Sequence, residues 1–256
     1  MSTGADGDRR IVVAADPDTL AAATEGTLRA AIAQAIAARG RAWIALAGGR
    51  TPRAVYERLA RAGTPTIDWT KVHVAFGDER LVPPDHADSN YGMARAALLS
   101  RVPVPEAQVH RIHGELPTTA AAAGAYADAL ADAFTLAPGS VPVFDVVLLG
   151  IGADGHTASL FPATPALLEH ARLAIGVTAP AAPVERVTLT FPVLNAAREV
   201  VILTAGADKA GAVGRALADD GDVETCPVRG IQPPGGRVTW HLDRAAASAL
   251  AAAGIE

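Results

Sequence analysis

Compact apolar runs alternate along the chain with stretches in which apolar residues recur at helical spacing. The runs predict strands at 43–47, 72–76 and 144–149, and further strands at 173–177, 186–190, 200–204 and 238–242. Helices are predicted at 19–38, from Thr51 onward, at about 91–99, at 118–134 and at 208–218, and another after Asp243. The run at 144–149 does not alternate with polar residues, which is typical of a parallel strand covered on both faces.

Capping residues mark the ends of two predicted helices. Asp16 and Pro17 indicate a helix start directly after a short apolar run at 11–14, and Gly40 can end the same helix. Thr118 or Thr119 can act as N-cap of the helix that follows them.

Strands that alternate with helices predict a mainly parallel, doubly wound α/β sheet between helix layers. A length of 256 residues fits one large domain or two small ones, and without a linker or repeat we expect a single α/β domain over residues 1–256. Such sheets bind ligands beyond the carboxyl ends of their strands. Polar or glycine-rich loops follow the strands at 43–47, 72–76 and 144–149. If these strands are neighbours, their loops meet in one crevice.

Composition narrows the classes of function. Half of the residues are apolar, so the chain can bury a sizeable core. The 22 basic and 27 acidic residues give a net charge of −5, which lacks the basic surplus typical of nucleic-acid binding. A small anionic ligand remains compatible with this charge.

The cysteine content and the lengths of the apolar segments are typical of a cytoplasmic protein. A single cysteine, Cys226, can form neither an internal disulfide nor a paired-thiol zinc or redox site. The N-terminal segment is polar and charged, and no segment has the roughly 18 uninterrupted apolar residues of a membrane span. We therefore expect a soluble, cytoplasmic protein with no membrane partner.

The first loop combines Gly48, Gly49, Arg50 and Thr51 with a helix N-terminus. Backbone N–H groups and the helix dipole at such a place can hold a phosphate, and Arg50 can add a charged contact. The same glycines can equally serve only a tight strand-to-helix turn. The loop also lacks the spacing of the dinucleotide fingerprint and of the P-loop.

The third loop carries His156 among three glycines, with Asp154 two residues before it. An imidazole can take or give a proton near neutral pH, and neighbouring glycine N–H groups can stabilise an oxyanion. The alternative is a histidine that is only hydrogen-bonded to the backbone. The position of His156 in the loop after a buried strand favours a catalytic role over this alternative.

The second loop begins with Asp78, Glu79 and Arg80. A carboxylate at a strand end can orient a histidine, bind a hydroxyl or act as a base, although a solvated charge cluster has the same sequence. His110 and His113 have a spacing that metal ligands can use. Prolines surround them and neither a paired carboxylate nor a thiol accompanies them, so no metal site is expected.

Two cations follow later in the chain. Arg186 begins a predicted strand, and Lys209 begins the helix predicted at 208–218, where each can project into the crevice. Only Lys71 and Lys209 are lysines, and the remaining basic residues are arginines. This rarity favours a specific role for the compact ammonium group of Lys209 over an ordinary solvated one.

Together these motifs resemble the family of 6-phosphogluconolactonases and glucosamine-6-phosphate deaminases. The segment GIGADGHTASLFP at 150–162 is similar to the family signature, and GDERLVPPDHADSNY at 77–91 resembles the lactonase version of a second motif. The loop at 48–52, Arg-Val-Thr at 186–188 and Gly-Ala-Asp-Lys at 206–209 match further family motifs in order and spacing. The resemblance spans about residues 11–243.

The resemblance implies a parallel sheet between helix layers and the hydrolysis of 6-phospho-D-glucono-1,5-lactone to 6-phospho-D-gluconate, the second step of the oxidative pentose phosphate pathway. No metal or organic cofactor is implied. By motif, His156 transfers the proton and Asp78 is its acidic companion. The phosphate is bound by Arg186, Lys209 and the loop of Gly48, Gly49, Arg50 and Thr51. Further site residues are Arg80, Asp154 and Asn90. The family usually has serine where Arg50 stands, which leaves the role of Arg50 open.

The residues suit this chemistry. A lactone is an activated ester, so an enzyme must place water against C1, remove a proton and stabilise an oxyanion. A general base such as His156 typically contributes about 10²–10⁴-fold. The chain has no Gly-x-Ser-x-Gly elbow, and Ser159 lies past the turn, so direct attack by water is favoured over an acyl-enzyme.

Three alternatives stay open. An aminosugar-6-phosphate deaminase or isomerase resembles this chain but carries glutamate where Phe161 stands and tyrosine where Arg80 stands. A non-catalytic sugar-phosphate sensor would use the same crevice. A dinucleotide-dependent dehydrogenase would need a Gly-x-Gly-x-x-Gly loop that the first helix lacks. The expected partner is a small sugar-phosphate lactone, with no nucleic acid or membrane, and the expected state is a monomer or weak homo-oligomer.

Overall fold

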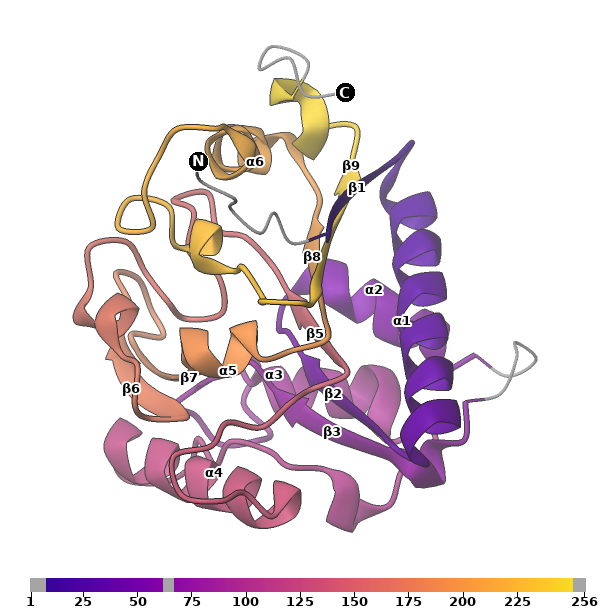
Figure 1. Cartoon of the computed structure of the whole chain (residues 1–256), viewed down its shortest axis with the longest axis vertical. Helices are drawn as coiled ribbons and strands as arrows, with labels where there is room; N and C mark the ends of the chain where they lie inside the picture. Colours follow the sequence, from indigo (N-terminus) through magenta and orange to yellow (C-terminus); the bar gives the residue numbers. More distant parts are fainter. Residues whose placement is uncertain (1–7, 62–66, 251–256) are drawn as a thin grey trace.

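A six-stranded parallel sheet forms the centre of the computed structural model, which describes residues 8–61 and 67–250 (Figure 1). The strand order is β1-β9-β8-β5-β2-β3, so the first and last strands of the described chain are neighbours. The strands are β1 (Asp8–Ala14), β2 (Ala42–Leu46), β3 (Val72–Phe76), β5 (Val146–Leu149), β8 (Glu199–Thr204) and β9 (Arg237–Asp243). The apolar runs therefore predicted β2, β3, β5, β8 and β9 within one or two residues of each end, and the short apolar run at 11–14 lies in β1.

A second, three-stranded sheet was not predicted. It consists of β4 (Asp78–Arg80), β7 (Glu185–Leu189) and β6 (Ala174–Thr178), paired antiparallel in that order. The strands predicted at 173–177 and 186–190 exist, but they lie outside the parallel sheet. Only residues 179–184 connect β6 to β7, and a parallel crossover needs a dozen or more residues, so the two strands form a hairpin. The start of the second loop pairs with this hairpin as β4.

Helices cover both faces of the main sheet. Helices α1 and α2 lie on one side, and α4, α6 and the second sheet lie on the other (Figure 1). The helices are α1 (Pro17–Arg39), α2 (Arg50–Leu59), α3 (Asn90–Ala94), α4 (Thr119–Phe134), α5 (Phe191–Asn195) and α6 (Ala210–Leu217). Asp16 and Thr118 cap α1 and α4, and Gly40 ends α1 with a φ of 73°, as their positions predicted.

Three helix predictions differ from the structure in detail. The helix expected at 91–99 is α3 followed by a π-helical turn at Arg95–Leu99. A 3₁₀ turn at Ala207–Lys209 precedes α6, and only a 3₁₀ turn at Ala246–Ala249 follows Asp243 within the described residues. Helix α5 was not predicted, because its five residues are too few to show a helical period.

Two buried tyrosines fix the strand ends that lead into the first two loops. The hydroxyl of Tyr56 in α2 accepts from the N–H of Ala47 at 2.9 Å and donates to its carbonyl at 2.8 Å. The hydroxyl of Tyr126 in α4 makes the same pair of bonds with Phe76, at 2.9 and 2.8 Å. Burial raises the pKa of both phenols, so both stay protonated and able to donate.

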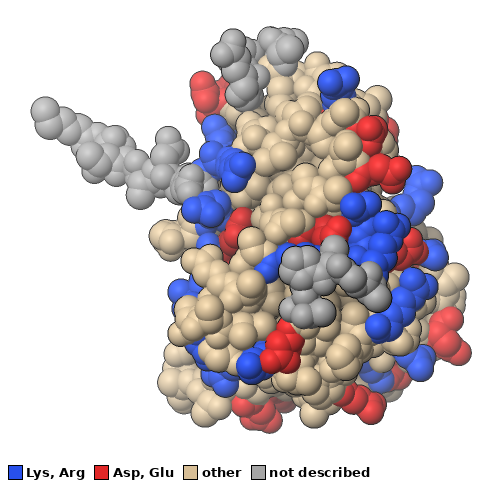
Figure 2. All heavy atoms as spheres, turned by 90° about the vertical axis from the view of Figure 1, so that its right-hand side faces the viewer, with Lys and Arg blue, Asp and Glu red and all other residues tan. Residues whose placement is uncertain are grey.

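The surface carries both signs of charge. Figure 2 shows the face that bears α1, where Lys and Arg side chains occur beside Asp and Glu. Glu25 in α1 pairs with Arg29 at 2.9 Å and with Arg58 of α2 at 3.0 Å. Among the helices at 8–61 and 67–250, none is long and apolar enough to cross a membrane.

The tyrosine bonds predict a measurable loss of stability in Tyr126→Phe. This substitution leaves the buried N–H and carbonyl of Phe76 without the hydroxyl, which costs about 1–3 kcal/mol of unfolding free energy. Urea unfolding measures the change. Tyr91→Phe is the control, because within the described residues the Tyr91 hydroxyl has no hydrogen bond to lose. Equal stabilities of the two variants would contradict the role of Tyr126.

A buried histidine predicts that the free energy of unfolding decreases in mild acid. His241 on β9 is 1% exposed, and burial lowers its pKa to about 4, against about 6.5 in an unfolded chain. As the pH falls from about 6.5 towards 4, the unfolded state takes up a proton that the folded state does not, so the free energy of unfolding decreases. In His241→Gln this decrease, measured by urea unfolding at several pH values, should be smaller. An unchanged pH dependence would show that His241 is not responsible.

Candidate active site

The three predicted loops meet in one cavity of about 320 Å³ at the carboxyl ends of β2, β3 and β5. Strand β2 pairs with β3 on one side and with β5 on the other, so the condition for a common crevice is met. Residues from the three loops and from two later segments line it: Ala47, Gly48, Gly49, Gly77, Asp78, Arg80, Asn90, Leu149, Gly150, Ile151, Gly152, His156, Ala158, Arg186 and Lys209.

His156 is oriented by Asp154, its neighbour in the same turn. The Nδ1 atom of His156 lies 2.6 Å from Oδ1 of Asp154, and the backbone N–H of His156 donates to the same oxygen at 3.1 Å. A carboxylate partner holds the ring proton on Nδ1 and leaves Nε2 able to accept one. A Cβ at Gly152 would collide with this pair, which explains the glycine there.

Burial opposes the ionisation of Asp154, but the hydrogen bonds and charge of His156 outweigh it, so the pKa of Asp154 lies below its ordinary value. The Asp154 carboxylate is therefore present as the anion at neutral pH. Asp154 contacts the Nδ1 edge of the His156 ring and does not line the cavity itself.

The turn that carries His156 is braced from α6 and the segment after it. Arg215 donates to the carbonyl of Ala153 at 3.0 Å, and the N–H of Val228 donates to the carbonyl of Gly155 at 3.0 Å. The N–H groups of Gly152 and Gly155 close the turn, bonding to the carbonyls of His156 and Gly152. These two glycine N–H groups are thus already engaged within the turn, unlike the free oxyanion donors that the sequence suggested.

Asp78 lies in the same cavity but does not contact His156 through a hydrogen bond. Its Oδ2 accepts from the hydroxyl of Ser159 at 2.7 Å, and its Oδ1 lies 3.2 Å from Nδ2 of Asn90, which also donates to the carbonyl of Asp78 at 2.9 Å. Asp78, Asn90 and Ser159 are all buried. A Cβ at Gly48 would collide with Asn90, so the first loop packs directly on this cluster.

Glu79 has a role that the sequence did not reveal. Its carboxylate accepts from the backbone N–H groups of Asn90 and Tyr91, both at 2.7 Å, and from the Ser89 hydroxyl at 3.0 Å. Burial raises the pKa of Glu79, and the N–H groups that it accepts from oppose this rise. Glu79 therefore holds the start of α3, and with it Asn90, in place. Alternation along β4, which sends adjacent side chains to opposite faces, separates Glu79 from Asp78.

Three cations face the cavity. Arg80 and Arg186 are register partners on β4 and β7, and Arg186 also donates through Nε to the carbonyl of Pro183 at 3.0 Å. Burial, and then the charge of Arg80, lower the pKa of Arg186 below its ordinary value. Nε of Arg80 is buried and has no hydrogen-bond partner within residues 8–61 and 67–250. Nζ of Lys209 lies 3.2 Å from Oδ2 of Asp208, in the 3₁₀ turn that precedes α6.

The first loop contributes less than predicted. Gly48 and Gly49 line the cavity, and Gly49 caps α2 with a φ of 108° that favours glycine. Arg50 is exposed and Thr51 half-buried, and neither lines the cavity. The part of the loop that faces a ligand is therefore its glycine backbone.

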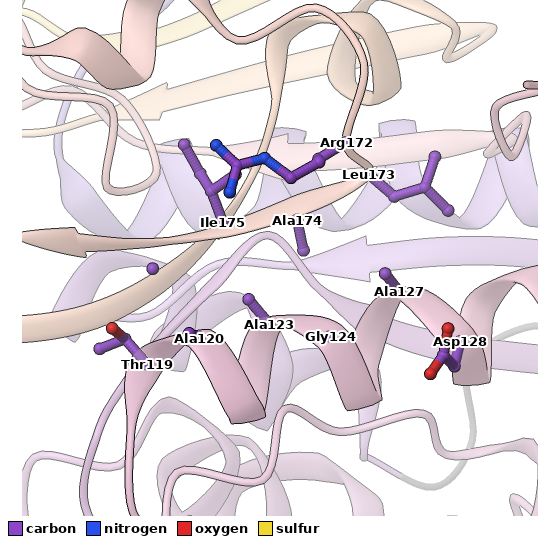
Figure 3. Close-up of a pocket in the computed structure, with 11 residues that line it drawn as sticks. Thr119, Ala120, Ala123, Gly124, Ala127, Asp128, Arg172, Leu173, Ala174 and Ile175 are labelled. Atoms are coloured by element: carbon purple, nitrogen blue, oxygen red, sulfur yellow. The ribbon is translucent and has the colours of Figure 1, made fainter.

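A second hollow, of about 310 Å³, lies between α4 and β6 and contains none of the predicted site residues. Figure 3 shows small side chains of α4 facing β6, with Arg172 and Asp128 at its margins. Arg172 is already paired with Glu169 at 2.6 Å. The chemistry is therefore concentrated in the cavity of His156.

The two histidines with metal-like spacing have other partners. Nε2 of His110 lies 3.2 Å from Nδ1 of His73, and Nδ1 of His113 lies 3.1 Å from Glu115. In the part of the chain that the structure describes, no group of three His, Cys, Asp or Glu side chains could hold a metal ion.

Comparison with known proteins gives a consistent result. The model of the family described as glucosamine-6-phosphate isomerases and 6-phosphogluconolactonases matches residues 15–240. A 6-phosphogluconolactonase from Synechocystis sp. is 47% identical over 223 residues, which are 86% of this chain and 89% of that protein. The human 6-phosphogluconolactonase is 43% identical over 238 residues, which are 87% of this chain and 90% of that protein.

A solved structure shows the same arrangement of the backbone. The 6-phosphogluconolactonase from Trypanosoma brucei superimposes with a TM-score of 0.81 at 33% identity, and the match covers 95% of this chain and 99% of that chain. This likeness agrees with the parallel sheet and helix layers described above.

The three cations predict that the cavity binds inorganic phosphate. Arg186→Ala or Lys209→Ala should raise the dissociation constant about tenfold, because each loses a charge-assisted hydrogen bond to the anion. Isothermal titration calorimetry measures the constant. Lys71→Ala is a matched control, since Lys71 is the other lysine and pairs with Asp68 away from the cavity. Equal affinities of Lys209→Ala and Lys71→Ala would contradict the assignment of Lys209.

Proposed function

Because this chain belongs to the family of glucosamine-6-phosphate isomerases and 6-phosphogluconolactonases, we propose a lactonase mechanism in which His156 is the general base. The chain hydrolyses 6-phospho-D-glucono-1,5-lactone to 6-phospho-D-gluconate, the second step of the oxidative pentose phosphate pathway. The activity expected from the motifs is thereby confirmed.

One observation carries the proposed mechanism: His156, oriented by Asp154, lines a cavity that Arg80, Arg186 and Lys209 also line. The substrate has an electrophilic carbon at one end and a phosphate at the other. A base and a group of cations within one cavity match these two ends, and the phosphate supplies binding energy that positions the lactone.

The steps of hydrolysis follow from the geometry at His156. Nε2 removes a proton from water as the water oxygen attacks C1, and the carbonyl oxygen becomes an oxyanion. When the tetrahedral intermediate collapses, the bond from C1 to the ring oxygen breaks, and the imidazolium returns the proton to that oxygen. The product acid then loses a proton to solvent.

We assign Asp78 to the substrate rather than to His156. Asp154 already orients the imidazole, and each Asp78 oxygen accepts a single side-chain hydrogen bond, which leaves lone pairs for a sugar hydroxyl. Asn90 and Ser159 hold the Asp78 carboxylate, and Arg186 and Lys209 take the phosphate. Gly48 and Gly49 supply backbone at the wall of the cavity, while Arg50 and Thr51 lie outside its lining.

Ser159 supports attack by water rather than an acyl-enzyme. Its hydroxyl is fully buried and donates to Asp78, so it is not presented to the carbonyl carbon. The deaminase branch of the family has glutamate at the position of Phe161. In this chain Phe161 is buried and its ring contacts His156. A deaminase activity is therefore not favoured.

We further propose that residues 1–256 act as one domain, in the cytoplasm, as a monomer or weak homo-oligomer. Pairing of β1 with β9 supports one domain, since the two ends of the described chain share a sheet. Cys226, the single cysteine, is buried, which suits a reducing compartment.

Substitution of His156 tests the mechanism. His156→Ala should lower kcat by about 10²–10⁴-fold with little change in KM, because the lost group acts on the reacting water. Arg186→Ala should mainly raise KM. A pH-controlled assay of proton release, corrected for spontaneous hydrolysis, measures both, and His113→Ala serves as a control for loss of an exposed imidazole. Turnover of His156→Ala at the level of this control would rule out His156 as the base.

A further inference from the structure

The ring of Phe161 contacts both the base and one of the cations of the cavity. Its ring centroid is 4.6 Å from that of His156, with an angle of 46° between the planes. The guanidinium carbon of Arg186 lies 5.5 Å from the same centroid. Phe161 is only 4% exposed, so the protein covers almost all of its ring. One fixed ring thus contacts two side chains that come from different parts of the fold.

The contact with His156 completes the orientation of the imidazole. The hydrogen bond from Nδ1 to Asp154 fixes one edge of the ring but leaves it able to tilt about that bond. The ring of Phe161 packs against the imidazole and limits this tilt. The direction of Nε2, which takes the proton from water, therefore depends on both neighbours.

The contact with Arg186 holds a cation that its neighbour repels. Arg80 stands opposite Arg186 in the register of β4 and β7, and two guanidinium groups at this separation disfavour each other. The hydrogen bond from Nε to the carbonyl of Pro183 and the negative charges of Asp78 and Asp88 oppose this repulsion. The negative face of an aromatic ring attracts a cation, so Phe161 adds a further restraint on Arg186.

We propose that Phe161 is a positioning residue that holds the general base and the phosphate-binding cation at a fixed separation. The proposal rests on the function given above for His156 and Arg186. It assigns to one aromatic ring an effect on both kcat, through His156, and KM, through Arg186. Leucine fills similar space but has no aromatic face, so an apolar side chain alone does not suffice.

The first test is Phe161→Leu. We expect kcat to fall about tenfold and KM for 6-phospho-D-glucono-1,5-lactone to rise about tenfold, a change equal to about 1.4 kcal/mol for each. The dissociation constant of inorganic phosphate, measured by calorimetry, should rise by a similar factor. Phe144→Leu is the matched control, because Phe144 is fully buried and its ring contacts Trp43 and Phe134 instead of His156 and Arg186. Kinetics of Phe161→Leu equal to those of Phe144→Leu would overturn the proposal.

The second test keeps the shape of the ring and remains informative if Phe161→Leu does not fold. Replacing Phe161 by 3,4,5-trifluorophenylalanine weakens the negative face while preserving packing. We expect KM and the phosphate dissociation constant to rise about threefold or more, with kcat within about twofold of the unmodified protein. Unchanged phosphate affinity in this variant would overturn the link to Arg186.

Phosphate affinity also separates this proposal from the mechanism it rests on. If the unmodified protein did not accelerate lactone hydrolysis, the proposed function would fail. The dependence of phosphate binding on the ring at position 161 would still be measurable, and it would decide the role of Phe161 towards Arg186 independently.

Discussion

The buried carboxylate of Asp78 ties together the loops that follow β2, β3 and β5. Ser159, from the loop after β5, donates to one of its oxygens, and Asn90, at the start of α3, approaches the other. Position 48 in the first loop must be glycine, because a side chain there would collide with Asn90. A buried carboxylate that loses its donors is strongly destabilising, so these four positions depend on one another. The placement of the turn at 150–156, and therefore of His156, follows from this junction.

Two carboxylates have different roles in the site because their surroundings differ. Asp154 is partly exposed and serves the imidazole, whereas Asp78 is buried and faces the cavity. Their separation explains how the site can orient a base and bind a polar substrate at once. The cations explain how a protein with a net charge of −5 binds a phosphorylated sugar, because the local field in the cavity, and not the overall charge, meets the substrate.

The sequence predicted the parallel sheet because its central strands are continuous apolar runs, and it predicted His156 because the loop after β5 stands out in glycine and polar residues. It did not predict that β6 and β7 form a hairpin, since the same apolar pattern fits either sheet and only the short connection decides. It left open whether Asp78 orients His156 or contacts the substrate, and in the structure Asp154 makes the hydrogen bond to His156. The hydrogen bonds within residues 152–156, and the contacts of Phe161, depend on backbone geometry that residue spacing does not determine.

The most direct measurement is a crystal structure of the protein with the product 6-phospho-D-gluconate bound. The account predicts the product carboxylate beside Nε2 of His156 and the phosphate on Arg186 and Lys209, with a sugar hydroxyl on Asp78. A product bound in the opposite direction, with its phosphate at His156, or bound outside this cavity, would contradict the account.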